Sequence, residues 1–154
     1  MNIQKTPSTL YVVADGGHAR FLLRPDAHSH LKPVGAMEAV HLHDPSRNLG
    51  RDRPGRTQES ATMARHAIEP RTDPHEAEKK GFHTLVGETI EQSWRRGEFD
   101  RLVIVAQAPA LQGIRDALDK SLQKVIAEEI RKDLTGKPVH ELESVLPRVL
   151  RYKT

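Results

Sequence analysis

Two short apolar segments constrain the fold of this 154-residue chain more than any other feature. Residues 10–14 are LYVVA, and residues 102–106 are LVIVA. An unbroken apolar run has no polar face, so each segment predicts a strand that is covered on both faces of a sheet. These two runs therefore predict an α/β fold in which both strands are central.

Two further strands are expected directly after the first apolar segment. Asp15, Gly16 and Gly17 form a tight-turn sequence because glycine accepts positive φ, so residues 18–24, HARFLLR, should return as a hairpin. A third strand is expected within residues 31–42. Pro33 has no N–H to donate to a neighbouring strand, which places this strand at the edge of the sheet.

A long helix is expected to begin beyond residue 72. Asp73 fits the N-cap, Pro74 the first helical position and Glu76 the third, and Gly97 fits the end of the helix. Apolar residues recur between these limits at helical spacing: Phe82, Leu85, Val86, Ile90 and Trp94.

Two further helices are expected after the second apolar strand. The first carries Leu111, Ile114, Leu118 and Leu122, and the last, from about Pro138, buries Leu142, Val145, Leu146 and Val149. Pro147 should interrupt the last helix. Residues 125–130 fit either an edge strand or an extension of the preceding helix, and their pattern alone leaves both open.

The order of these elements predicts one fold class: α/β, with a single mixed five-stranded sheet and helices on both faces. Three strands in a meander are followed by helix, strand, helix, strand and helix, with the first and fourth strands adjacent. This is a ribonuclease H-like arrangement. The length suits one domain over residues 1–154.

The net charge of the chain is concentrated in the arginine segment, residues 44–72. The chain has 24 basic and 21 acidic residues, and these numbers become equal without four arginines and one aspartate of this segment. Guanidinium groups bind phosphate or carboxylate bidentately, and Gly50, Pro54 and Gly55 can shape a defined bend. The predicted anion- or RNA-binding residues are Arg47, Arg51, Asp52, Arg53 and Arg56. Internal bracing and an idle solvated loop remain alternatives.

A second candidate site comprises Asp15, His18 and Arg20, at the end of the first strand. A metal-dependent phosphoesterase would need further carboxylates there, and Asp100 and Asp133 are the candidates. The fourth strand itself ends in AQAP, without an acid. The sequence has no Gly-x-Ser-x-Gly, Walker or dinucleotide motif, so we expect no catalytic residue and no cofactor.

The remaining histidines and the N-terminus give weaker signals. His41 and His43 alternate beside Asp44, but with nine histidines in the chain we interpret them as solvated and expect no metal. The N-terminal apolar run is too short for a signal peptide or a membrane span, and there is no cysteine. We expect a cytoplasmic protein that does not enter a membrane.

Several motifs resemble those of the bacterial host attachment protein family. They are Val13-Ala14-Asp15 with Ala19-Arg20, Asp52-Arg53-Pro54-Gly55-Arg56, Phe99-Asp100 before the second apolar strand, Ile114-Arg115, and Lys132-Asp133-Leu134-Thr135. The resemblance spans residues 11–145, and the Asp-Arg-Pro-Gly-Arg element is its most specific part. Arg51 stands where the family pattern suggests a small residue before Asp52.

This family is similar to the middle domain of archaeal and eukaryotic peptide-chain release factors. The similarity implies that residues 123–133 contain a strand and suggests RNA or the ribosome as the partner. An acidic protein surface is the alternative partner, and the sequence does not set the oligomeric state. Gly16-Gly17 is followed by His18, so the Gly-Gly-Gln of release factors is missing and peptidyl-tRNA hydrolysis is not implied.

Overall fold

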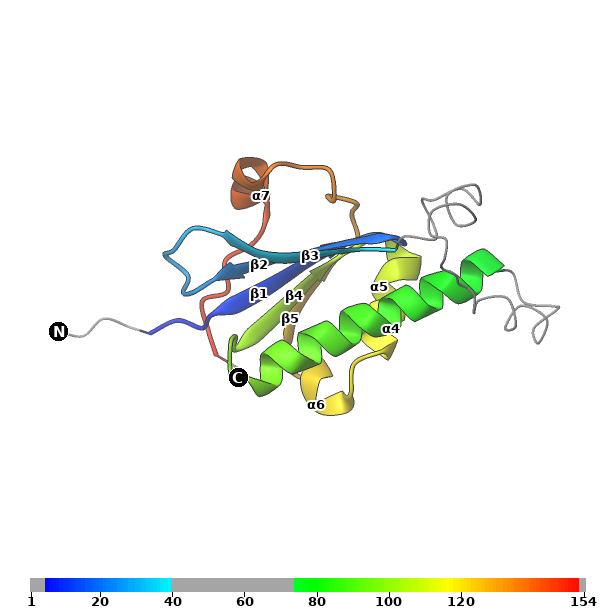
Figure 1. Cartoon of the computed structure of the whole chain (residues 1–154). Coiled ribbons are helices and arrows are strands. Elements are labelled where there is room, and N and C mark those ends of the chain that lie inside the picture. The colour runs from blue at the N-terminus through cyan, green and yellow to red at the C-terminus, as the bar shows by residue number, and fades with distance from the viewer. Residues whose placement is uncertain (1–4, 40–73, 153–154) are drawn as a thin grey trace.

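A computed structural model describes residues 5–39 and 74–152, with residues 74–78 described by their backbone alone. The arginine segment and Asp73 lie outside the described residues. Five strands form one sheet in the order β3-β2-β1-β4-β5 (Figure 1). Their bounds are β1 Thr9–Ala14, β2 His18–Arg24, β3 Lys32–Glu38, β4 Arg101–Val105 and β5 Ile126–Ile130.

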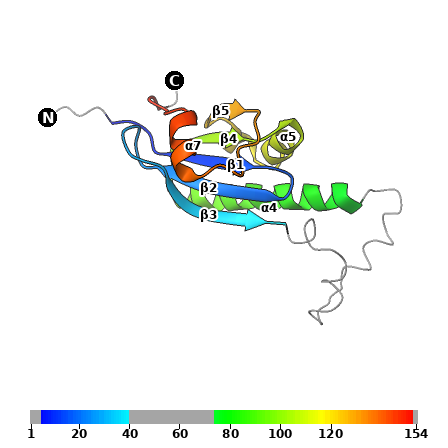
Figure 2. The ribbon, with the colours of Figure 1, turned by 90° about the horizontal axis from the view of Figure 1, so that it is seen from above.

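The sheet is mixed, as the sequence predicted. β1 pairs antiparallel with β2 and parallel with β4, while β3 and β5 form the two edges (Figure 2). β3 pairs antiparallel with β2, and β5 pairs parallel with β4. The predicted edge position of the Pro33 strand is confirmed, and residues 126–130 are a strand rather than helix.

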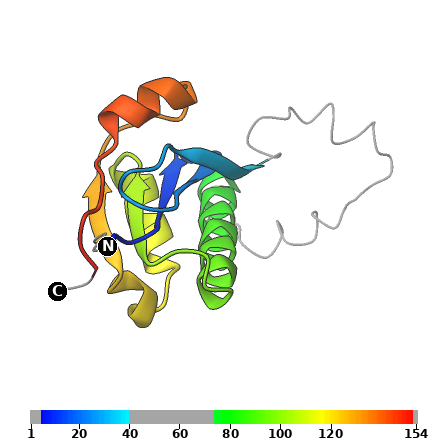
Figure 3. The same ribbon diagram turned by 90° about the vertical axis from the view of Figure 1, so that its left-hand side faces the viewer.

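Helices cover both faces of the sheet, which confirms the α/β class. In Figure 1, α7 lies above the sheet and the other helices lie below it. Their bounds are α4 Pro74–Arg95, α5 Ala108–Asp116, α6 Lys120–Gln123 and α7 Val139–Val145. Figure 3 shows the C-terminal segment running along β5, where the Arg101 guanidinium donates to the carbonyl of Arg151.

The alternating side chains of β1 supply both halves of the core. Leu10, Val12 and Ala14 pack with the α4 side of the molecule, while Tyr11 and Val13 pack with the α7 side. All six residues of β1 are buried. Burial on both faces explains why this segment has no polar position.

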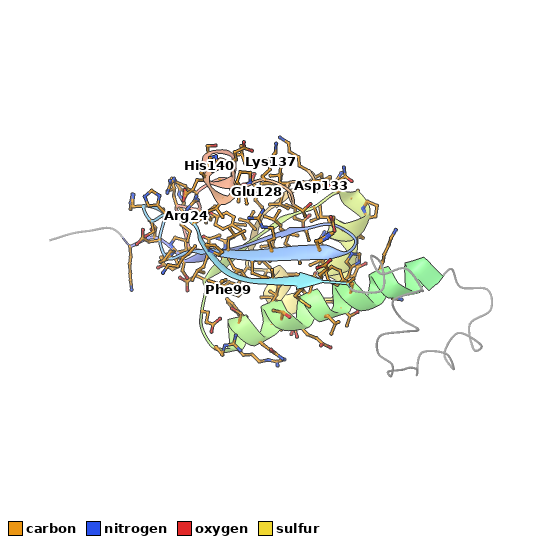
Figure 4. The ribbon with its side chains drawn as sticks, turned by 45° about the horizontal axis from the view of Figure 1, so that its top comes forward. Arg24, Phe99, Glu128, Asp133, Lys137 and His140 are labelled. Carbon is orange, nitrogen blue, oxygen red and sulfur yellow. The ribbon has the colours of Figure 1, made fainter. Side chains whose placement is uncertain are left out.

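A buried polar network holds the chain beyond α7 to the sheet. Arg24 is 1% exposed, and it donates to the Tyr11 hydroxyl at 2.9 Å and to Glu143 at 3.4 Å. Tyr11 donates in turn to the carbonyl of Pro147 at 2.6 Å, and Leu31 N–H donates to the second oxygen of Glu143. Figure 4 shows Arg24 below α7, toward the opposite end of the sheet from Asp133.

Two glycines allow close packing beside α4. A Cβ at Gly87 would lie 2.8 Å from the Cβ of Ala117 and 3.2 Å from its carbonyl oxygen. A Cβ at Gly113 would lie 2.3 Å from Nδ1 of His83. A side chain at Gly87 would displace the backbone of Ala117, and one at Gly113 would displace the buried ring of His83, so glycine is favoured by space rather than by φ.

The structure corrects three details of the helix predictions. The helix expected to carry Leu111 through Leu122 is two helices, because Asp119 accepts from Leu122 N–H at 3.1 Å and caps a separate α6. Val145, expected to be buried, is 55% exposed, since α7 ends there and Leu142 and Leu146 face the core instead. Leu85 is also exposed, because the neighbouring Val86 faces the sheet.

The close approach at Gly87 yields a testable prediction. Gly87→Ala should destabilise the protein by about 1–3 kcal/mol, because the new methyl group meets the Cβ and the carbonyl oxygen of Ala117, neither of which can rotate away. Gly81→Ala is the matched control, since nothing lies within 4 Å of its added Cβ and the same helix should gain up to about 1 kcal/mol. Urea unfolding measures both, and equal midpoints for the two variants would contradict the packing.

The Glu143 network predicts a pH-dependent stability. Burial raises the pKa of Glu143, but the Leu31 N–H and the charges of Arg24 and His30 outweigh burial, and the pKa is lowered overall. A lowered pKa in the folded state stabilises the fold above about pH 4.3, the ordinary glutamate value, and this stabilisation is lost as the pH falls.

Glu143→Gln should therefore cost about 2–4 kcal/mol at pH 7, because it leaves the Arg24 charge uncompensated. The difference from the wild type should shrink as the pH falls below 4, where the wild-type carboxyl is also neutral. Denaturant unfolding at several pH values measures this. A difference that stays constant with pH would show that the charge of Glu143 has no part in it.

Candidate functional site

The predicted residues Asp15, His18 and Arg20 line one pocket at the carboxyl end of β1. The pocket has a volume of about 440 Å³, and Glu38 and Thr135 complete its polar lining. Asp15 follows β1, His18 and Arg20 belong to β2, and Glu38 ends β3. We call this site the turn pocket.

The carboxylate of Asp15 organises the turn between β1 and β2. Its Oδ1 accepts from Gly17 N–H at 2.8 Å and from His18 N–H at 2.6 Å, and Nδ1 of His18 lies 3.1 Å away. Burial raises the pKa of Asp15, but these hydrogen bonds and the His18 charge outweigh burial and lower the pKa overall. Asp15 is therefore held as a carboxylate by its own turn.

The loop after β5 closes the turn pocket from the other side. Thr135 Oγ1 lies 2.7 Å from an oxygen of Asp133 and 3.3 Å from Oδ2 of Asp15, so its single hydroxyl proton can serve either carboxylate. Arg20 donates to the carbonyls of Thr135, at 3.1 Å, and of Lys137. Figure 4 shows Asp133 and Lys137 on the α7 side of the sheet. The Arg20 bonds and the contact between Thr135 and Asp15 join segments that are more than 100 residues apart in sequence.

Basic groups gather around the turn pocket. The ring of His18 lies between Asp15 and Glu38, with Nε2 3.9 Å from an oxygen of Glu38. The side chain of Lys79 lies beside Gly16, where an added Cβ would meet it at 3.6 Å. Together with Arg20, these residues give the pocket nitrogen donors that suit an anion. The carboxylates of Asp15 and Glu38 lie beside them and would orient a ligand that carries hydrogen-bond donors of its own.

The two carboxylates proposed to assist Asp15 lie in different places. Asp133 approaches it through Thr135, whereas Asp100 lies at the other edge, where it accepts from Ser8 N–H at 3.0 Å before β1 and β4 begin. β1 and β4 are parallel, so Asp100, which precedes β4, and Asp15, which follows β1, lie at opposite ends of these strands. Among the side chains that the structure describes, in residues 5–39 and 79–152, no group of three His, Asp or Glu could hold a metal.

The predicted residues Arg47, Arg51, Asp52, Arg53 and Arg56 lie outside the described residues, as do His41, His43 and Asp44. On the amino-terminal side of the arginine segment, the last described residue, Ala39, directly follows Glu38 of the turn pocket. Ala39 N–H donates to the carbonyl of Gly17 at 2.8 Å, and Lys79, in the second turn of α4, lies beside Gly16. The chain thus leaves the described structure beside the turn pocket, and it re-enters at Pro74, in the helix that carries Lys79.

Sequence reasoning missed the other residues of the turn pocket. Glu38 could have been found, because hairpin pairing of β2 with β3 sets it opposite His18. Thr135 gave no local signal, since its place depends on the loop that follows β5 across the sheet. Only the three-dimensional arrangement brings it to Asp15.

Comparisons with known proteins identify a family. A family model described as "Protein required for attachment to host cells" matches residues 10–146. None of the curated proteins matches the chain. A solved structure described as "Archaeal protein" is 13% identical, with a TM-score of 0.48, over 89% of this chain and 33% of that one. The chain therefore spans about a third of that protein's length.

Among the helices of residues 5–39 and 74–152, none is both long and apolar enough to cross a bilayer.

The hydrogen bonds of Asp15 predict a graded response to substitution. Asp15→Ala removes the acceptor of two backbone N–H groups and should cost about 1–2 kcal/mol. Asp15→Asn keeps a carbonyl oxygen in the same place and should cost clearly less. Urea unfolding at pH 7 compares them, and an equal loss in both variants would show that the charge, rather than the turn geometry, is what matters.

Proposed function

The chain belongs to the family of proteins required for attachment to host cells, and from this premise we propose that it is a non-catalytic binding domain. It contacts RNA or ribosomal phosphates through Arg47, Arg51, Arg53 and Arg56. The distribution of charge carries this proposal: outside these arginines and Asp52, basic and acidic residues are equal in number.

The position of the described residues that flank the arginine segment supports the proposal. Ala39 and Lys79 lie near the turn pocket, where Arg20 and His18, both on β2, add nitrogen donors. In this proposal the arginines act together with the donors of the turn pocket. Phosphate contacts of this kind position a protein on RNA without reading its sequence.

The bonding of Asp15 supports binding rather than catalysis. Both of its oxygens lie within hydrogen-bond distance of groups of the protein, from Gly17, His18 and Thr135. A carboxylate held in this way shapes a turn and orients the His18 ring, and it is poorly placed to act as a nucleophile or to share a metal.

The proposed site of action is the cytoplasm, where RNA and ribosomes are available. An effect on attachment would then be indirect, through translation or its regulation. Cell fractionation tests this, because recovery of most of the protein in the outer membrane or the medium would contradict an intracellular role.

The arginine segment predicts the outcome of a binding experiment. Purified ribosomes and bulk cellular RNA should bind the wild type at low salt, and an Arg51→Ala, Arg53→Ala, Arg56→Ala variant should lose at least about tenfold in affinity, as expected when three phosphate contacts are removed. The matched control replaces the exposed Lys5, Lys120 and Lys124 by alanine, which removes the same charge elsewhere.

The control separates a local contact from net charge. The proposal expects the lysine variant to bind nearly as well as the wild type, with both variants folded by circular dichroism. An equal loss of affinity in the two variants would show that binding depends on the overall charge and not on the arginine segment. If the wild type binds neither ribosomes nor RNA, the proposal is wrong, and docking of an acidic protein surface becomes the better account of the arginines.

A further inference from the structure

A second concave site lies at the start of β4, at the opposite end of the central strands from the turn pocket. It has a volume of about 710 Å³, within the roughly 300–1,000 Å³ range of small-molecule sites. It forms where α4 ends, β4 begins and the C-terminal segment passes. We call it the aromatic groove, and its main lining residues are Trp94, Arg95, Phe99, Asp100, Arg101 and Tyr152.

The groove is rich in aromatic side chains. The whole chain has three phenylalanines, two tyrosines and one tryptophan, and Trp94, Phe99 and Tyr152 line this one groove. Phe99, beside the C-terminal end of α4 in Figure 4, is buried and braces Trp94 with ring centroids 5.3 Å apart. Tyr152 is 41% exposed, and its hydroxyl donates to the carbonyl of Thr6 at 3.1 Å. The groove thus offers two aromatic rings that are held by the protein.

Charged groups surround these rings. The guanidinium of Arg101 is fixed by bonds to the carbonyls of Val125, at 3.0 Å, and Arg151, at 3.2 Å. Arg95 is exposed and lies 3.7 Å from Glu91. Asp100 uses one oxygen to accept from the backbone and hydroxyl of Ser8, which leaves its other oxygen as an acceptor. Aromatic faces, arginine and one acceptor suit a flat base that carries an anionic group.

We infer that the aromatic groove binds a nucleotide unit, either a free nucleotide or one residue of single-stranded RNA. The base stacks on Trp94 and Tyr152, its amino group donates to Asp100, and Arg95 and Arg101 attract the phosphate. Concavity and nucleotide-like size favour this ligand over a flat protein surface. The inference is independent of the arginine segment, because it rests only on described residues that line the groove.

The sole tryptophan provides the assay. Trp94 fluorescence is titrated with AMP, GMP, CMP and UMP, and with six-residue homopolymers of the same bases. We expect saturable quenching, because a base that stacks on the indole changes its emission. Tyr152→Leu should weaken binding by about 5- to 100-fold, the loss of one stacking contact, and Arg95→Gln should weaken it less.

Two controls accompany these variants. Lys120→Gln removes a positive charge outside the groove and should leave quenching unchanged. The Arg51→Ala, Arg53→Ala, Arg56→Ala variant should also be quenched like the wild type, so failure of the groove and failure of the arginine contact are distinguishable. Circular dichroism confirms that each variant is folded.

Each outcome decides the inference. Quenching by mononucleotides supports a free nucleotide as ligand, and quenching by the homopolymers alone supports single-stranded RNA. No saturable quenching by either ligand overturns the inference, as expected for a groove that docks a protein instead. Quenching that is equally strong in Tyr152→Leu also overturns it, because the base would then not lie between the two rings.

Discussion

Burial of β1 on both faces is the constraint on which the rest of the structure depends. Its six residues are all buried, so its backbone groups must be paired on both sides and its side chains covered above and below. β2 and β4 supply the pairing, and the clusters on the α4 and α7 sides supply the cover. Helices on both faces are a consequence of this one strand.

The same constraint leaves the two ends of the central strands as the places where polar chemistry can occur. At the carboxyl end, Asp15 satisfies the turn and meets Thr135 from the far side of the sheet. At the other end, Asp100 bonds to Ser8, and Trp94 and Tyr152 gather beside it. The Tyr11 hydroxyl, which accepts from Arg24, donates to the carbonyl of Pro147 and so holds the chain beyond α7 across the sheet, which helps to bring Tyr152 to this end of the sheet.

Local patterns predicted the strands, the edge position of Pro33 and the class of the fold, because apolar runs, turns and proline act on their own neighbourhood. Gly97 ends its helix region with positive φ, as a local signal should. Long-range contacts were not predictable in the same way. Thr135 at Asp15, Tyr152 beside Trp94 and Gly87 against Ala117 each depend on how distant segments pack. The break between α5 and α6 was missed because the capping role of Asp119 competes with an unbroken apolar spacing.

The central functional claim is that arginine contacts with phosphate dominate binding. The most direct test is the affinity of the wild-type protein for bulk cellular RNA across a range of salt concentrations. Four arginine contacts to single-stranded phosphates predict a slope of about −3 in a plot of log affinity against log salt. A slope near zero would contradict the account, because binding that releases no counterions does not depend on phosphate charge.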